Sequence, residues 1–390
     1  MDPLLKGEQA VLGAVLLAPG QLDSLRWLEP TDFYRPAHQA LFAAMRKLRA
    51  DGLLTPGTQN DVPLSWVTDT VAEAGRHARG LTASYAHALI AACPRPQNAP
   101  VYGRMVLEGS IHRTVAEYAA RLEEVARIDA RAREIDGVLK HSEVLADALT
   151  GLARRWGTES RPVAPTEPVQ PQPATVPVVA DDRLEDEQFL LALLVERPVA
   201  IEEVVGWLRP ADFGDPGHGH LYRCLGALHH RGEPIDRVTV LWEIQRRGLL
   251  ADGLLREDQL GAILGVGGAG SAEWLGDQVI RASLTRTAAE AARTIRALAS
   301  DARLAPGQLI GHALHALGPL EEVRTRWRTS ASPPSPHPAD PAIRISAALA
   351  RSAPRQHPRS TAPERPTPPS TAPIRTPART SPSLSARSTP

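Results

Sequence analysis

The chain has 390 residues, and its 44 Lys plus Arg balance its 44 Asp plus Glu, so no chain-wide charge draws it to nucleic acid or to an anionic membrane. Its two cysteines, Cys93 and Cys224, exclude a disulfide framework and fit a reducing compartment. No apolar run reaches the roughly 18 residues of a membrane span, and the run Ala10–Ala18 lacks the basic start of a signal peptide. We therefore expect a cytoplasmic protein without a membrane partner.

Two parts of the sequence repeat one another. The stretch WLEPTDFYRPAHQALFAAMRKLRADG, from Trp27, aligns without a gap with WLRPADFGDPGHGHLYRCLGALHHRG, from Trp207, and the match closes with Trp156 against Trp327. We therefore predict two copies of one domain, a Pro-rich linker between them and a tail after them. Copy one, linker, copy two and tail are residues 1–157, 158–182, 183–328 and 329–390.

The stretch GDPGHGHLYRC, residues 214–224, brings two imidazoles and a thiol together and suggests a metal site. Only His218 has a counterpart in copy one, namely His38; His220 and Cys224 align with alanines. Since no fourth ligand is evident either, we expect no metal and no other cofactor. The two shared histidines, each in the first turn of a helix, are expected to pack or to form a local hydrogen bond.

Apolar spacing predicts helices nearly throughout, and the longest pattern closes each copy. There the apolar residues advance by alternating steps of three and four, which is typical of the seam between paired helices. Two seams separated by a short turn predict an antiparallel hairpin in each copy, after a bundle of four or five helices. The predicted seam residues are Ile111, Val115, Tyr118, Leu122, Val125, Leu145, Leu149, Leu152 and Trp156 in copy one, and Leu284, Ile295, Leu298, Leu320, Val323 and Trp327 in copy two.

Two helices cannot bury two such seams without leaving apolar surface exposed, so each hairpin needs a partner. The linker holds the other copy's hairpin close by, at a high effective concentration. We therefore expect an all-α chain of two tandem helical bundles whose hairpins pair as an intramolecular pseudo-dimer. Pairing between chains, as a homo-oligomer, is the alternative.

Several stretches carry a resemblance to a known family. Copy one has Glu8-Gln9 followed by LGAVLL, then LEPTDFYRPAHQALFAAMRKL, and copy two has GEPIDRVTVLWEIQRRG at 232–248. These stretches resemble the N-terminal domain of bacterial replicative helicases of the DnaB type. Copy one departs from the family pattern after Gly52, and copy two has Gly214 where the family has Tyr.

The resemblance implies an all-α domain that pairs through its hairpin and forms a collar receiving the primase and, in some systems, a loader. The motor of that family uses a P-loop, whose Lys reaches the nucleotide phosphates. No Gly-Lys-Ser or Gly-Lys-Thr occurs in this sequence, and GVGGAG, 265–270, has no Lys and is predicted to be a loop between helices. We therefore expect a non-enzymatic replication protein that binds the replicative helicase or the primase. The alternative is a subunit of an ATP-dependent helicase whose motor lies on another chain.

After Ser330 the sequence consists mainly of Pro, Ser, Thr, Ala and Arg, which predicts a disordered tail. Its arginines outnumber its acids, so the tail is a candidate for DNA contacts without sequence preference; a merely solvating appendage is the alternative. A protein that binds DNA through this tail is thus a third hypothesis of function. The candidate phosphate contacts are Arg344, Arg351, Arg355, Arg359, Arg375 and Arg379.

Overall fold

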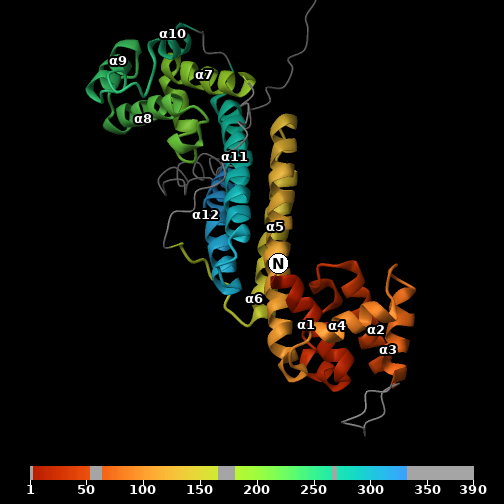
Figure 1. Ribbon diagram of the computed structural model, residues 1–390. Coiled ribbons are helices and arrows are strands. Elements are labelled where there is room, and N and C mark those ends of the chain that lie inside the picture. The colour runs from red at the N-terminus through yellow and green to blue at the C-terminus, as the bar shows by residue number, and fades with distance from the viewer. Residues whose placement is uncertain (1–2, 53–63, 166–180, 266–269, 332–390) are drawn as a thin grey trace, which may run out of the picture. The chain divides into compact units, whose positions relative to one another are not determined.

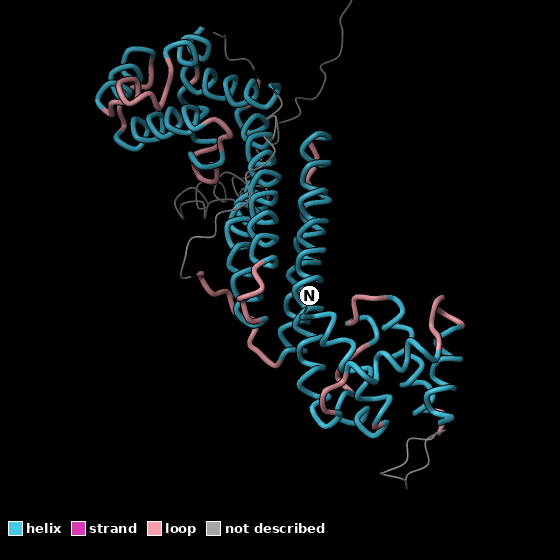
Figure 2. Tube along the Cα trace, viewed as in Figure 1, coloured by secondary structure: helices cyan, strands magenta, loops and turns pink. Residues whose placement is uncertain are grey.

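The computed structural model describes residues 3–52, 64–165, 181–265 and 270–331, which lie in one compact unit, 1–333. Every regular element in these ranges is a helix, which confirms the expected all-α class for them (Figures 1 and 2). The six candidate arginines of the tail and most of the GVGGAG stretch lie outside the described residues. None of the described helices is both long and apolar enough to cross a membrane.

Copy one begins with a bundle that packs around its first helix. The bundle elements are α1 (Pro3–Leu17), η1 (Pro19–Leu25), η2 (Pro30–Asp32), α2 (Pro36–Ala50), α3 (Leu64–Gly75), α4 (Ala83–Ala92) and η3 (Pro96–Asn98). Helix α1 is apolar nearly all round, and Val11, Leu12, Val15 and Leu16 are fully buried. A helix with this pattern belongs in a core, and α1 contacts α2, α4 and the long helix that follows the bundle.

That long helix opens the hairpin of copy one, which consists of α5 (Ala99–Ala132) and α6 (Asp136–Trp156). The turn between them is built by Asp129, whose buried carboxylate accepts a hydrogen bond from the backbone N–H of Val138 at 2.8 Å. A Cβ at position 137 would stand 2.7 Å from Asp129 Oδ1, so the carboxylate fits there only because residue 137 is glycine. The chain reverses through Arg133, which has a left-handed backbone conformation (φ 59°).

Copy two repeats this order. Its elements are α7 (Asp181–Glu196), η4 (Pro198–Glu203), η5 (Pro210–Asp212), α8 (Pro216–Arg231), α9 (Arg237–Arg246), α10 (Glu257–Gly265), α11 (Ala272–Ser300) and α12 (Pro306–Ala331). Helix α8 starts with Pro216 as its first residue, and Asp215 caps it by accepting a hydrogen bond from Gly217 N at 2.7 Å. Helices α11 and α12 form the second hairpin, with a short turn at 301–305.

Candidate protein-interaction site

The two hairpins contact each other within the chain. Helix α5 packs against α11 and α6 packs against α12, and Figure 1 shows α5 and α11 side by side. The contacts run in opposite directions along the two long helices: His112 of α5 meets Ala299 near the end of α11, whereas Ala130 and Thr285 are both bonded to Arg183. Helices α5 and α11 are therefore antiparallel.

Most predicted seam residues lie in the buried interior of this arrangement. The buried ones are Ile111, Val115, Leu122, Leu145, Leu149, Leu152, Leu284, Ile295, Leu298, Leu320 and Val323. Tyr118, Val125, Trp156 and Trp327 are half-buried. The apolar seams thus form the core shared by the four helices α5, α6, α11 and α12.

The register of the seam on α5 differs from the predicted one. The buried positions after Val115 are Ala119, Leu122 and Ala126, whereas the predicted Tyr118 and Val125 lie beside that line. The buried residues advance from Ile111 by steps of four, four, three and four. These steps are on average longer than the 3.5-residue repeat of a heptad. The line of buried residues on a straight α-helix departs from the heptad pattern in the same way.

Trp156 and Trp327, at the ends of the hairpins, each bind the two helices of one hairpin together. Their contacts do not join one hairpin to the other. Arg104 of α5 stacks over Trp156 of α6, 4.3 Å from the ring centroid. In copy two, Trp327 Nε1 donates to Asp277 Oδ1 at 3.1 Å, so α12 is bonded to α11 in the corresponding place. Each tryptophan therefore joins the two helices of its own copy.

Polar side chains add directional contacts between the copies. Both ring nitrogens of His112 lie against carbonyl oxygens of copy two, Ala299 O at 2.9 Å and Leu304 O at 3.0 Å. A carbonyl oxygen only accepts, so the imidazole is the donor in this contact between the copies. Two ion pairs, Arg296 with Glu123 at 2.5 Å and Arg324 with Glu143 at 3.0 Å, also cross between the hairpins.

The start of the predicted linker lies along α12. The backbone N–H of Val163 donates to Gly311 O at 2.9 Å, and Thr158 lies beside Gly307. A Cβ at position 311 would stand 3.1 Å from Val163 Cγ2 and 3.2 Å from Arg161 O, which is tighter than an ordinary van der Waals contact, so glycine favours this close approach. Residues 158–165, the linker strap, therefore fasten the end of the first hairpin to the second.

Each copy also contains a buried aspartate that ties its bundle to its hairpin. Asp32, fully buried at the end of η2, accepts hydrogen bonds from Ser110 of α5 at 3.0 Å and from Arg155 of α6 at 2.7 Å. Asp212 does the same in copy two with Ser283 of α11 and Arg326 of α12. This network was not predicted from the sequence, although Arg155 and Arg326 directly precede the matched tryptophans Trp156 and Trp327.

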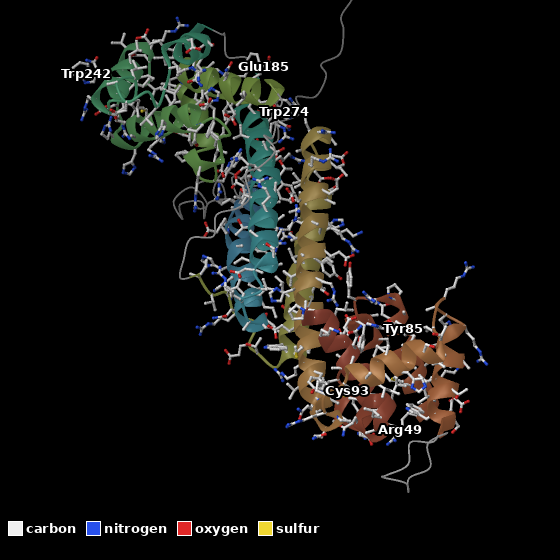
Figure 3. The ribbon with its side chains drawn as sticks, in the orientation of Figure 1. Arg49, Tyr85, Cys93, Glu185, Trp242 and Trp274 are labelled. Atoms are coloured by element: carbon white, nitrogen blue, oxygen red, sulfur yellow. The ribbon has the colours of Figure 1, made fainter. Side chains whose placement is uncertain are left out.

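The two shared histidines are buried, as expected of packed side chains, but their hydrogen-bond partners are distant in the sequence rather than local. His38 Nδ1 lies 2.6 Å from the Glu8 carboxylate of α1 and its Nε2 lies 2.8 Å from the hydroxyl of Tyr85, labelled on α4 in Figure 3. His218 Nδ1 lies 2.8 Å from Glu187 in the same way. Glu8 and His38 recur as Glu187 and His218 in copy two, and this recurrence is the feature of the sequence that could have pointed to the pair.

His218 is thus bonded to a carboxylate, and no group of three potential metal-ligating side chains was found among the described residues. Cys224 is fully buried, and this burial raises the pKa of its thiol to about 11. A thiol in this environment stays protonated at neutral pH and is a poor nucleophile. The described residues around His218 and Cys224 therefore act as core.

The chain is similar to known proteins over parts of its length. The family model described as "DnaB-like helicase N terminal domain" matches residues 3–108 and 180–258. The Replicative DNA helicase DnaB of Mycobacterium leprae (strain TN) is 44% identical over 64 residues, which are 16% of this chain and 11% of that protein. The Replicative DNA helicase DnaB of Geobacillus stearothermophilus is 34% identical over 140 residues, which are 36% of this chain and 29% of that protein.

Among solved structures, the crystal structure of the N-terminal domain of DnaB helicase from Mycobacterium tuberculosis is 31% identical, with a TM-score of 0.29. That match covers 36% of this chain and 94% of the solved domain. The curated relatives above are matched over less than a third of their own length. The resemblance seen in the sequence is thereby confirmed, and residues 3–108 and 180–258 of this chain belong to the family of DnaB-like helicase N-terminal domains.

Proposed function

We propose that this chain acts in DNA replication as a non-enzymatic docking protein, which binds a replicative helicase or a primase. The family to which residues 3–108 and 180–258 belong supports a role in DNA replication, because relatives with this domain are named replicative DNA helicases. The observation that carries the proposal is the pairing of the two hairpins inside one chain. Two domains joined in advance offer a partner one pre-organised surface, which lowers the entropic cost of binding.

The state of the buried carboxylates also supports docking over catalysis. Asp32 and Asp212 are bonded to arginines, and Glu8 and Glu187 are bonded to histidines. A general acid or base must be free to exchange a proton with a substrate. These four carboxylates instead join helices of the bundles and the hairpins.

The test is size-exclusion chromatography of the full chain with the replicative helicase and, separately, with the primase of its own host, at roughly 10 µM of each protein. Co-elution with either protein supports the proposal, and the absence of a complex with both overturns it. The substitution Ala119→Leu should weaken co-elution, since Ala119 lies in the buried seam of the hairpins. The matched substitution at its exposed neighbour, Ala120→Leu, should leave co-elution unchanged.

ATP hydrolysis in the same mixtures separates docking from the alternative function. If this chain only docks, the ATPase activity belongs to the partner, and the partner alone already hydrolyses ATP. If ATP turnover arises only when this chain is mixed with a second chain that is inactive by itself, the chain is a helicase subunit with its motor in trans.

A further inference from the structure

Helix α9 of copy two exposes an apolar stripe that no described element covers. Val238, Leu241, Trp242 and Gln245, here called the α9 stripe, follow the spacing i, i+3, i+4, i+7 and so share one face of the helix. Val238 is 75% exposed, Leu241 42% and Trp242 62%. Figure 3 shows Trp242 at the outer side of α9. Apolar residues gathered on one face in this way mark an interaction surface.

The fold itself does not require these side chains. Helix α3 of copy one corresponds to α9 when the buried acids Glu73 and Glu243 are aligned, since each is bonded to cations from its own bundle. In that alignment, the positions of Val238 and Trp242 are occupied by Thr68 and Ala72. Copy one therefore builds the same helix without the exposed apolar pair.

The surface is held rigidly from beneath. Glu243, on the buried side of α9, pairs with Arg231 of α8 at 2.9 Å and with Arg247 at 2.6 Å. These hydrogen bonds outweigh the effect of burial, so the pKa of Glu243 is lowered and its charge is kept. At the start of the helix, Asp236 accepts hydrogen bonds from Val238 N at 2.8 Å and Thr239 N at 2.9 Å. The α9 stripe is thus fixed before any partner binds.

Beside the stripe lies a hollow of about 400 Å³, the α8–α9 groove, lined by the stripe together with Leu228 of α8 and Glu233. Glu233, Thr239 and Gln245 are the polar members of this lining, and the rest is aliphatic or aromatic. A groove between two helices with such a lining fits a third, amphipathic helix. The apolar anchors of such a helix recur every three or four residues and would meet Val238, Leu241 and Trp242.

Two exposed arginines flank the stripe, whereas the nearby carboxylates of Glu233 and Asp236 are engaged by Arg231 and by backbone N–H groups of α9. Arg237 precedes the stripe, is exposed, and forms no ion pair with the described residues. Arg246 follows it, and its nearest carboxylate is that of Glu243 at 3.9 Å, which already serves two closer arginines. The two cations are nine residues apart, or about 13 Å along the helix. An acidic side chain of the partner near each end would pair with them.

We propose that the α8–α9 groove binds an amphipathic α-helix with acidic flanks, supplied by a partner protein. This assignment rests on the proposed docking function and adds the chemistry of the partner. The chain's own tail has the wrong charge, because its arginines outnumber its acids. A second copy of the chain is disfavoured as well, because its α9 would add a second Arg237 and a second Arg246 to the same interface. Single-stranded DNA would use Trp242 and the arginines but gains nothing from Val238 and Leu241, which have no ring on which a base can stack.

The test uses the full chain and a fluorescein-labelled helical peptide of about 18 residues, with leucines on one face and glutamates on both flanks. A twin peptide carries lysine in place of each glutamate, and an oligo(dT) of about 20 nucleotides serves as the third probe. Fluorescence anisotropy should show that the glutamate peptide binds at least about tenfold more tightly than its lysine twin. Trp242→Ser should weaken binding of the glutamate peptide about tenfold or more. Trp274→Ser, at another exposed tryptophan, should not.

A charge-reversed variant tests the role of the two arginines. The double substitution Arg237→Glu with Arg246→Glu should reverse the preference, so that the lysine peptide binds more tightly than the glutamate peptide. Equal binding of both peptides to the unaltered chain would overturn the proposal, and so would unchanged binding by Trp242→Ser. Tighter binding of oligo(dT), or a dimer in sedimentation that Trp242→Ser abolishes, would assign the groove to DNA or to a second copy instead.

The groove and the proposed docking function can fail independently of each other, and the experiments distinguish the two failures. If the glutamate peptide binds as expected but neither the helicase nor the primase co-elutes with the chain, the groove stands and the replication partner is wrong. If a partner co-elutes equally well with the unaltered chain and with Trp242→Ser, and the peptide fails to bind, the groove is wrong and docking occurs elsewhere.

Discussion

Asp212 and Arg326 are 114 residues apart in the sequence, and both terminal nitrogens of the Arg326 guanidinium donate to the buried Asp212 carboxylate, one of them at 2.8 Å. Asp32 and Arg155 form the matching pair in copy one. Each pair fastens a short 3-10 turn of the bundle to the last helix of the same copy. The pairs therefore fix the angle between bundle and hairpin, and with it the placement of any docking surface on the bundle.

The first prediction concerns this pair. Arg326→Ala should lower the free energy of unfolding by about 3 kcal/mol, because Asp212 is then left as a buried carboxylate without its cation. Urea unfolding of the full chain measures the loss. Arg328→Ala, two residues further along α12 at an exposed position, is the control and should change the free energy by less than about 0.5 kcal/mol. Equal midpoints for the two variants would contradict the role given to Arg326.

A second prediction concerns the contact between the copies. His112→Ala should destabilise the chain by about 1–3 kcal/mol, since the carbonyl groups of Ala299 and Leu304 lose the imidazole that they face in a packed interface. Thermal unfolding provides the measurement. His87→Ala removes an exposed histidine of α4 and should have almost no effect. Should both variants melt with the unaltered chain, His112 does not hold the hairpins together.

The linker strap supports a third prediction. Gly311→Val should displace residues 158–165 from α12, because the new side chain would collide with Val163 and with the Arg161 carbonyl. The glutamate-specific protease should then cut after Glu159 about tenfold faster, as mass spectrometry of the fragments can follow. Gly318→Val is the matched control on the same helix, since nothing lies within 4 Å of a Cβ there. The strap is unimportant if both variants are cut at the rate of the unaltered chain.

The pKa of Cys224 gives a fourth prediction. Burial raises it to about 11, so the thiol keeps its proton and only about one molecule in a thousand carries the thiolate at pH 8. In a Cys93→Ser background, alkylation of the folded chain should be slow at pH 8 and should accelerate as the pH rises towards 11. In urea the same thiol should react at the rate of an ordinary cysteine. Rapid alkylation of the folded chain at pH 8 would show that Cys224 is accessible and ionised.

The duplication made much of the fold predictable from the sequence. Trp156 and Trp327 recur at the ends of matched helical patterns, so two hairpins followed from one comparison, and the structure describes both. The long-range partners of the repeated residues were not predictable in the same way. Glu8 and His38 recur in both copies, yet only the packing of α1 against α2 shows that they meet. Recurrence marks a residue as important without saying what it contacts.

The α9 stripe escaped prediction for the opposite reason. Its two most exposed residues, Val238 and Trp242, have no large apolar counterpart in copy one, so comparison of the copies does not reveal them. An i, i+3, i+4, i+7 pattern is also equally typical of a helix face that faces a core. The buried side of α9 is carried by Val240, Glu243 and Ile244, and this choice depends on where α8 lies. The face that a helix buries is thus a tertiary property.

The register of the α5 seam leads to the last prediction. A heptad placed Tyr118 and Val125 in the seam, whereas the straight helix turns Ala119 and Ala126 inward. Ala119→Leu should therefore cost about 1–3 kcal/mol, because the larger side chain must be forced into a packed interior. Ala120→Leu, its exposed neighbour, should be neutral or slightly stabilising, since leucine has a helix propensity close to that of alanine. Urea unfolding of the two variants decides the register: a larger loss for Ala120→Leu would mean that α5 is rotated from the position described, and the hairpin contacts with α11 would then have to be reassigned.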